Sequence, residues 1–441
     1  MSELAVDWKK KSIGELTTVI RGASPRPKGD PRYYGGNVPR LMVSDVTRDG
    51  KWVTPRTDFL TEAGALLSRP MKKGGLVVVC SGTVGVPCFL NVDACIHDGF
   101  LGLTNIVSDV DPDYLYQQFL FLKNDLDSSA THGGIFTNLT TDIIKQFVIS
   151  VPSYIQQQKI ANILNTVDKL IEKTQTLIDK YTAIKQGMMA DLFTRGIDLS
   201  LGPDGTPASN PNYGQLRDSV EDAPELYQQT ELGWVPKDWE VCVLGENITK
   251  IDSGWSPVCD SEVAQSHEWG VLKTTAVVWD GYKDYKNKKL PLNLKGAKSV
   301  EVKVGDLLVT RKGPMDRVGV VVHVNKTRPQ LMFPDTVFRF RVNSDYVMSP
   351  RFAALCLGAY SVQNQWDIRK IGLAEAQVNI NHGIVNNTLV PIPKNEEQES
   401  IICTLATITE KIEIELALFS KYKLQKSGLM QDLLTGKVRV N

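Results

Sequence analysis

The chain has few cysteines for its 441 residues, and none lies in a pattern that carries a disulfide framework or a metal. The seven cysteines are an odd number, form no CxxC pair and are not joined by a cluster of histidines. Such usage indicates a reducing compartment. There is no apolar run of about 18 residues, and the opening MSELAVDWKKKS lacks a signal-peptide core. We therefore expect a cytoplasmic protein with no membrane span and no zinc site.

Catalytic signatures are also missing. The sequence has no GxxxxGK[ST] phosphate loop, no HExxH zinc helix and no GxSxG nucleophile turn. Carboxylates are frequent, but nothing in the sequence directs two of them to one site. We interpret Asp45, Asp98 and Asp335 as turn or structural residues, and we predict that the chain has no catalytic residues and no cofactor of its own.

One short match tests that conclusion. Asn210-Pro211-Asn212-Tyr213 resembles the Asn/Asp-Pro-Pro-Tyr/Phe loop with which adenine-N6 methyltransferases hold a flipped base. Its third residue is Asn, its surroundings are acidic, and no glycine-rich strand–loop–helix precedes it. The linker interpretation is favoured, and a stand-alone adenine-N6 DNA methyltransferase is kept as an alternative.

Two long amphipathic segments dominate what is present. Residues 155–194 contain no proline and place apolar or small residues at alternating steps of four and three, from Ile160 to Leu192. This spacing predicts one long coiled-coil helix. Residues 396–435 repeat the seam at an offset of 241, and Lys180-Tyr181, Gly187 and Met189 recur there as Lys421-Tyr422, Gly428 and Met430. The recurrence predicts that the two helices pair. The polar seam positions, which could set register or contact a partner, are Thr174, Tyr181, Lys185, Glu415, Tyr422 and Lys426.

The repeat continues upstream of both helices. At an offset of 231, Gly14-Glu15 matches Gly245-Glu246, and after one inserted residue Gly22-Ala-Ser-Pro matches Gly254-Trp-Ser-Pro. Strand-like runs dominate each copy, with shorter helices expected near 112–122 and 349–357. A Pro/Gly-rich linker with one basic and seven acidic residues separates the copies, in a chain whose 50 basic and 50 acidic residues balance. We predict a first domain at 1–150, a helix at 151–196, a linker at 197–231, a second domain at 232–392 and a second helix at 393–436.

Loops rich in basic, hydroxyl and amide side chains recur at matching places in both copies. Arg and Lys suit phosphates and guanine edges, whereas Asn and Gln suit adenine. The candidate contacts in the first copy are Arg21, Ser24, Arg26, Lys28, Arg40, Ser44, Ser81, Thr83, Thr131, His132 and Asn138. Those in the second copy are Ser253, Trp255, Lys273, Thr274, Arg311, Lys312, Arg369, Lys370, Gln377 and Asn379.

Taken together, these motifs resemble the specificity subunit of type I restriction–modification systems. The resemblance rests on the order domain, helix, domain, helix, on the Gly-Asp-Leu-Leu-Val strand turn at 305–309, and on the linker end Leu-Gly-Trp-Val-Pro at 232–236. Its most specific part is the helix end Lys-Ser-Gly-Leu-Met-Gln-Asp-Leu-Leu-Thr-Gly at 426–436. The first copy departs from the pattern at Gly74-Gly75 and at Gln156-Gln157.

The resemblance implies an α+β fold with a pseudo-twofold internal repeat, in which two mixed α/β target-recognition domains are separated by two long antiparallel coiled-coil helices. It implies a non-catalytic, cytoplasmic subunit that reads a bipartite target in double-stranded DNA. The helices would fix the spacer and dock two modification subunits, which carry S-adenosylmethionine, and a motor-nuclease restriction subunit could join. A coiled-coil scaffold without DNA contact is the remaining alternative.

Overall fold

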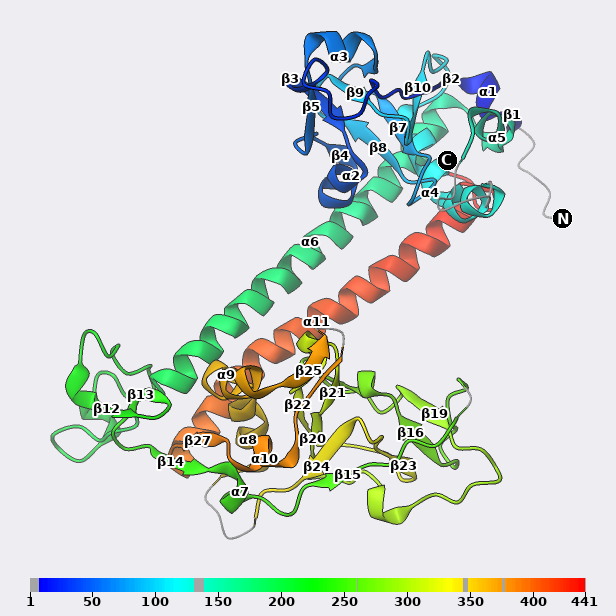
Figure 1. Ribbon diagram of the computed structural model, residues 1–441. Helices are drawn as coiled ribbons and strands as arrows, with labels where there is room; N and C mark the ends of the chain where they lie inside the picture. Colours follow the sequence, from blue (N-terminus) through cyan, green and yellow to red (C-terminus); the bar gives the residue numbers. More distant parts are fainter. Residues whose placement is uncertain (1–7, 131–138, 260, 344–347, 375–376, 441) are drawn as a thin grey trace. The chain divides into compact units, whose positions relative to one another are not determined.

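The computed structural model describes residues 8–130, 139–259, 261–343, 348–374 and 377–440. Its contacts divide the chain into two compact units, residues 1–176 with 415–441 and residues 177–414. Each unit contains a β-rich domain and one half of each long helix (Figure 1). The predicted α+β class with two long helices is confirmed.

Unit 1 is built on two sheets. One has the strand order β2-β10-β7-β8-β4 and the other β5-β3-β9-β6, while β1 and β11 pair by themselves. The strands are β1 Lys9–Ser12, β2 Thr18–Arg21, β3 Tyr34–Leu41, β4 Trp52–Val53, β5 Asp58–Leu60, β6 Arg69–Met71, β7 Leu76–Val79, β8 Pro87–Leu90, β9 Ala94–Ile96, β10 Phe100–Thr104 and β11 Val148–Val151. The helices are α1 Ile13–Leu16, α2 Val43–Asp49, α3 Glu62–Leu66, α4 Pro112–Ser129, α5 Thr141–Gln146 and the long α6 Tyr154–Thr194.

Unit 2 contains smaller sheets. Their strand orders are β15-β24-β20-β22, β19-β16-β23 and β21-β26-β25, with the separate pairs β12-β13, β14-β27 and β17-β18. The strands are β12 Tyr227–Thr230, β13 Gly233–Pro236, β14 Glu240–Val243, β15 Asp252–Ser253, β16 Gly270–Leu272, β17 Val277–Val278, β18 Gly281–Tyr282, β19 Asn287–Lys289, β20 Leu307–Thr310, β21 Lys312–Gly313, β22 Val321–His323, β23 Leu331–Met332, β24 Val337–Phe340, β25 Ile371–Ala374, β26 Gln377–Asn379 and β27 Leu389–Ile392. The helices are α7 Leu244–Asn247, α8 Pro350–Leu357, α9 Tyr360–Arg369, α10 His382–Asn386 and the long α11 Asn395–Leu433. Five short 3-10 turns complete the described elements, at Pro207–Ser209, Pro224–Leu226, Thr274–Ala276, Lys298–Val300 and Met315–Arg317.

The internal repeat is visible in the topology. The order β2-β10-β7-β8 in unit 1 corresponds to β15-β24-β20-β22 in unit 2, and both sets pair antiparallel. The strand pair β1-β11 corresponds likewise to β14-β27. The apolar runs expected as strands form β7, β8, β20, β22 and β24, and their buried side chains build the cores. The similarity of the two copies therefore reflects one fold used twice.

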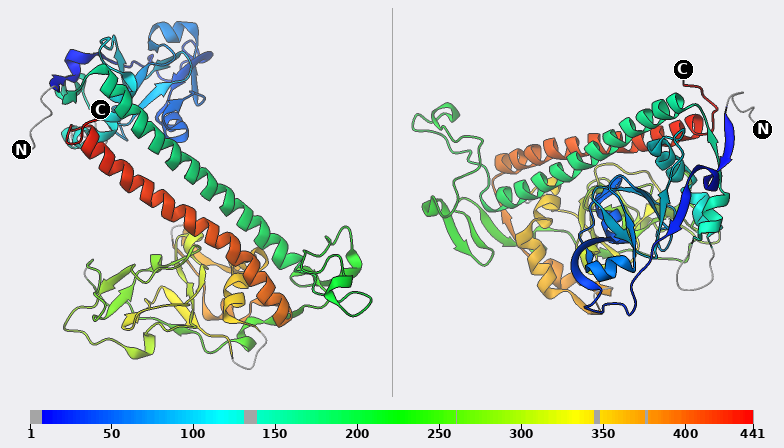
Figure 2. Two further views of the ribbon diagram at one scale, coloured as in Figure 1. Left: turned by 180° about the vertical axis from the view of Figure 1, so that it is seen from behind. Right: turned by 90° about the horizontal axis from the view of Figure 1, so that it is seen from above.

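The two long helices run side by side and antiparallel (Figures 1 and 2). Within unit 1 the start of α6 meets the end of α11, because Ile160 and Leu164 share a buried cluster with Met430 and Leu433. Within unit 2 the other halves meet: Leu192 near the end of α6 shares a buried cluster with residues from the start of α11. The predicted apolar seam is thus the buried face of both helices.

The polar seam residues differ in how they are accommodated. Thr174 is 5% exposed, and its hydroxyl donates to the Leu170 carbonyl one turn earlier, at 2.8 Å. Lys426 pairs with Asp168 at 2.5 Å inside unit 1. The equivalent Lys185 in unit 2 forms no ion pair among the described residues, and burial lowers its pKa. Tyr181, Glu415 and Tyr422 are half-buried.

The first turn of each long helix carries a buried glutamine that binds the helix to its own domain. In unit 1 the Gln157 amide donates to the Asp109 and Pro152 carbonyls and accepts the N–H of Asp111, the N-cap of α4. In unit 2 Gln398 donates to Pro393 and accepts the N–H of Ser349, the N-cap of α8. A buried amide must satisfy both of its ends, so this geometry fixes where the helix leaves the domain.

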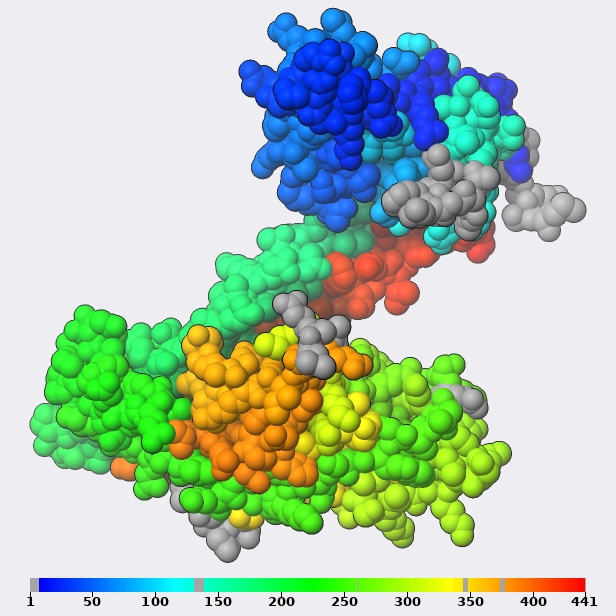
Figure 3. Space-filling view, in the orientation of Figure 1, coloured from blue at the N-terminus to red at the C-terminus, as the bar shows by residue number. Residues whose placement is uncertain are grey.

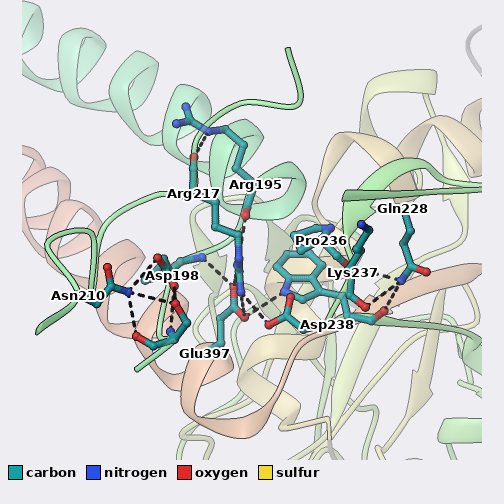
Figure 4. Close-up of polar contacts among 12 residues, drawn as sticks. Arg195, Asp198, Asn210, Arg217, Gln228, Pro236, Lys237, Asp238 and Glu397 are labelled. Atoms are coloured by element: carbon teal, nitrogen blue, oxygen red, sulfur yellow. Dashed lines mark hydrogen bonds and ion pairs between the residues drawn. The ribbon is translucent and has the colours of Figure 1, made fainter. Parts of the chain in front are cut away.

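The linker is held by a buried ion pair in unit 2, between Arg217 and Glu397 (Figure 4). Glu397 accepts both terminal nitrogens of Arg217, at 2.5 and 3.0 Å, the Trp239 indole N–H at 3.0 Å and the Ile197 amide at 2.8 Å. The Arg217 guanidinium also contacts Asp238 at 2.9 Å. In the space-filling view the linker forms a lobe of its own at the surface (Figure 3).

We expect Glu397→Gln to destabilise unit 2 by about 3 kcal/mol, since it leaves a buried guanidinium without its bidentate partner. Urea unfolding measures the loss, and hydrogen exchange at the start of α11 locates it. Glu396→Gln is the matched control, because Glu396 is exposed and one residue earlier. Equal midpoints for the two variants would contradict the role given to Glu397.

Candidate nucleic-acid interface

In unit 1 the loop after β2 carries the Gly22-Ala-Ser-Pro motif and lies against the turn before β10. The Gly22 amide donates to the Phe100 carbonyl at 2.9 Å and the Ala23 amide to the Ile96 carbonyl at 3.1 Å. A Cβ at Gly22 would collide with the His97 carbonyl, so only glycine permits this approach. The motif is therefore a docking element, and it sets the position of the residues that follow.

Asp98 is the centre of this loop. Its carboxylate accepts the Ser24 hydroxyl at 2.7 Å, and the Arg26 guanidinium lies 3.7 Å away. Arg40 donates to Ser24 at 2.7 Å and pairs with Asp58, and Arg21 donates to the Asp98 carbonyl at 3.1 Å. Four predicted contact residues, Arg21, Ser24, Arg26 and Arg40, are thereby brought together.

Unit 2 repeats this arrangement with different residues. Ser256 of the second Gly-x-Ser-Pro motif donates to Asp335 at 2.5 Å, and Lys312 lies 3.6 Å from the same carboxylate. The Trp255 amide donates to the Phe333 carbonyl at 3.1 Å. Asp98 and Asp335 are thus structural residues, as predicted, but each also holds a basic side chain that remains about half exposed or more, Arg26 at 73% and Lys312 at 47%.

Arg311 lies beside this turn. Its guanidinium donates to the Ser253 hydroxyl at 3.3 Å and stacks over the Phe338 ring at 4.7 Å. Its Nε is buried and has no hydrogen-bond partner among the described residues. Its amide donates to the Thr336 carbonyl at 2.9 Å, and the Thr336 hydroxyl bonds Thr274 at 2.6 Å. Ser253, Thr274, Arg311 and Lys312 therefore form one cluster.

The other predicted residues lie around these clusters or outside them. In the small sheet β21-β26-β25, Lys312 pairs with Asn379, and Gln377 begins the central strand. Lys370 is tied to Asp367 and to the Met315 carbonyl. Ser44 on α2 lies near Thr57, at 3.4 Å. The remaining described residues occupy exposed or half-buried positions in loops and at helix ends, namely Lys28, Ser81, Thr83, Lys273 and Arg369. Thr131, His132 and Asn138 lie outside the described residues.

The sequence interpretation missed several residues of these clusters, among them His97, Asp58 and His382. His382 lies 3.4 Å from the Ser253 hydroxyl and 4.5 Å from the Phe338 ring. His97 accepts the Gly99 amide on Nδ1 at 2.8 Å, and Phe100 packs against its ring. The contacts span up to 129 residues of sequence, so no local pattern could indicate them.

The Asn210 loop has a structural role in unit 2. The Asn210 amide nitrogen donates to the Asp198 carboxylate at 3.1 Å and to the Ser200 carbonyl at 2.9 Å, and its oxygen accepts the Asn212 amide. A side chain occupied in this way is not free to hold a base. Across the part of the chain that the structure describes, no three acidic, His or Cys side chains could hold a metal ion, and no helix is long and apolar enough to cross a membrane.

Comparison with known proteins relates the chain to one family. A family model, described as the type I restriction modification DNA specificity domain, matches residues 5–181. The MjaVIII specificity subunit of Methanocaldococcus jannaschii is 24% identical over 98% of this chain and 93% of its own length. Residues 5–181 thus contain a type I restriction modification DNA specificity domain, and nearly the whole chain is similar to a type I restriction–modification specificity subunit.

Further comparisons show similarity of sequence over a part of this chain and similarity of fold over nearly all of it. The EcoEI specificity subunit of Escherichia coli is 40% identical over 39% of this chain, a match that spans 29% of the relative's length. The crystal structure of a specificity subunit from M. genitalium covers 98% of this chain and 97% of its own, with a TM-score of 0.56 at 11% identity. A structure reported for complex assembly of a type I system covers 99% and 100% of the two chains, with a TM-score of 0.52 at 14% identity. A specificity subunit is the non-catalytic component of such an enzyme.

The surroundings of His97 predict a pH-dependent stability in unit 1. Burial, together with the nearby Arg40 charge, lowers the pKa of His97 below its ordinary value. His97 then binds a proton more readily in the unfolded chain than in the folded one. Its contribution to the free energy of unfolding is therefore fully present above about pH 6.5, and it is lost as the pH falls through the pKa of His97 in the folded state.

We therefore expect protection factors for amides in residues 94–104 to fall between pH 7.5 and pH 5.5, and His97→Gln to flatten that change. Hydrogen exchange, corrected for the intrinsic pH dependence, measures both. His267→Gln is the control, because His267 is exposed. An equally steep pH response in His97→Gln would show that another group is responsible.

Proposed function

We propose that this specificity subunit reads a bipartite sequence in double-stranded DNA, with residues 1–150 and 232–392 forming one target-recognition domain each. The observation that carries the proposal is the duplicated loop. In both domains a serine of the Gly-x-Ser-Pro motif and a basic side chain meet one aspartate beside a strand end. Two equivalent serine–aspartate contacts, each with a partly exposed basic side chain, suit two half-sites better than one continuous site.

The chemistry of the loops fits contact with a duplex. Arg26 and Lys312 stay partly exposed beside their aspartates, so they can bind phosphate or guanine. Gln377 and Asn379 supply amides of the kind that pair with adenine. Their pairing with carboxylates weakens unspecific attraction to the phosphate backbone, because a negative charge lies beside each cation. The same pairing holds the cations in a defined orientation before DNA arrives.

The long helices suit a second role. We propose that α6 and α11 act as a rigid spacer between the half-sites and as the docking surface for two modification subunits, which supply S-adenosylmethionine and methyl transfer. The repeated seam supports this, since each copy presents an equivalent helix with Lys185 or Lys426 and Tyr181 or Tyr422 at matching positions. A motor-nuclease subunit would join the same assembly.

Exchange of residues 1–150 with 232–392 should reverse the order of the two half-sites and leave the spacer between them unchanged. Each domain would take its loops with it, while the helices stay in place. Sequencing of methylated sites in cells that carry the exchanged chain and its modification subunit gives the result. Recognition of the original sequence in its original order would refute the assignment of one half-site to each domain.

Duplication of one heptad in both helices, residues 171–177 and 412–418, should lengthen the spacer by about three base pairs. Seven helical residues add about 10 Å, a base-pair step is about 3.4 Å, and a whole heptad keeps the seam in register. The same methylation map reads the spacer. Duplication of a heptad in α6 alone is the control, since it breaks the register and should lower stability. An unchanged spacer in the doubly extended chain would count against the helices as a ruler.

A further inference from the structure

A basic pocket lies in the second domain, beside strands β15 and β24, which contribute Asp252 and Arg339 to its lining. It has a volume of about 320 Å³. Its lining residues are Lys298, Lys303, Arg339 and Arg341, with Asp252, Thr249, Ser299 and Phe340. Among the described residues, the carboxylates paired with these cations are Asp252, in the lining, and the buried Asp306 beneath it, so four cations and two carboxylates give a net charge of +2. An open pocket with this excess attracts an anion.

The floor of the pocket is fixed before any ligand binds. Arg339 donates to Asp252 at 2.5 Å and to the carbonyls of Ser299 and Glu301 at 2.8 and 2.9 Å. Asp306, fully buried, accepts the Arg341 Nε at 2.7 Å and the Lys303 amide at 2.7 Å. These bonds orient the Arg341 guanidinium and hold the turn that carries Lys303.

The cations at the rim are left available. The terminal nitrogens of Arg341 and the ammonium groups of Lys298 and Lys303 have no hydrogen-bond or ion-pair partner in the described part of the chain. The Arg341 side chain is 45% exposed, whereas that of Arg339 is 14% exposed. A guanidinium fork beside two ammonium groups is the donor set that phosphate oxygens match.

The first domain shows that the fold does not require this cluster. Strand register places Gly102 where the second domain has Arg339, and Ile20 where it has Asp252. Two residues past Gly102 stands Thr104 in place of Arg341, and Gly75 precedes β7 where Asp306 precedes β20. A Cβ on Gly102 would lie 2.8 Å from the Met71 sulfur and 3.1 Å from Ile96, so apolar side chains fill that space.

Four charged residues of the second domain thus replace four uncharged ones at one place in a shared fold. A salt-bridge network alone would need no unpaired cations at its rim. We infer that this pocket binds a phosphate group, and that its source is the DNA backbone beside the half-site read by the second domain. The choice of source rests on the proposed function, whereas the pocket itself does not.

The test removes rim charge without disturbing the arginine–aspartate floor. In Lys298→Gln with Lys303→Gln, the slope of log K against log salt for DNA binding by the full chain should fall in magnitude by about 0.9 for each phosphate that the variant no longer neutralises. Affinity should weaken equally for the cognate duplex and an unrelated one. Lys295→Gln with Lys326→Gln is the matched control, because it removes two exposed lysines of the same domain outside the pocket.

A second arm separates the two sources of phosphate. Inorganic phosphate is titrated into the full chain, and thermal unfolding is followed for both double variants. If phosphate stabilises the parent chain but not the rim variant, while the DNA salt slope is unchanged, the pocket takes a free anion and the backbone assignment is wrong. If neither readout distinguishes rim from control, the inference is overturned. A parent chain that binds phosphate but no DNA would refute the proposed function and leave the pocket intact.

Discussion

The antiparallel seam of α6 and α11 is the constraint on which both units depend. Unit 1 completes its core with Met430, Leu433 and Leu434, which lie almost at the end of the chain, and packs them around Trp8 and Ile160. At about 1.5–3 kcal/mol for each large apolar side chain buried, these residues contribute substantially to a domain of ordinary stability. The first domain therefore reaches its full stability only when the end of α11 packs against it.

The ends of the helices extend this dependence. Gly436, just past α11, lies against the Trp8 ring in unit 1, and Gly196, just past α6, lies against Trp239 in unit 2. The end of each helix thus docks on the tryptophan that opens a domain. The two copies differ in the polar contacts at this place. In unit 2 Glu397 accepts the Trp239 indole N–H and pairs with Arg217, whereas in unit 1 the position equivalent to Glu397 is Gln156. One fold therefore accommodates both solutions.

Periodicity and recurrence predicted the helices, the seam and the repeat, because these depend on spacing within short stretches of chain. The expected helix at 112–122 continues to Ser129, since no proline or glycine ends it earlier. The clusters around Asp98 and Asp335 could not be predicted, because Ser24 and Ser256 lie 74 and 79 residues away from their carboxylates. The structural role predicted for Asp98 agrees with its contacts, but its basic partners become apparent only when the turn before β10 meets the loop after β2.

The same reasoning explains why the basic pocket had no sequence signal. Asp252, Asp306 and Arg339 come from three strands or strand ends, and each alone is an ordinary charged residue of a β-rich domain. They are recognised as a group only when the two copies are aligned by strand register, because the first copy has uncharged residues at the equivalent positions. Residues that read bases must vary with the target, whereas a phosphate contact is independent of sequence. A phosphate pocket on the strand framework would therefore let the loops diverge freely while the second domain keeps a constant share of its affinity for DNA.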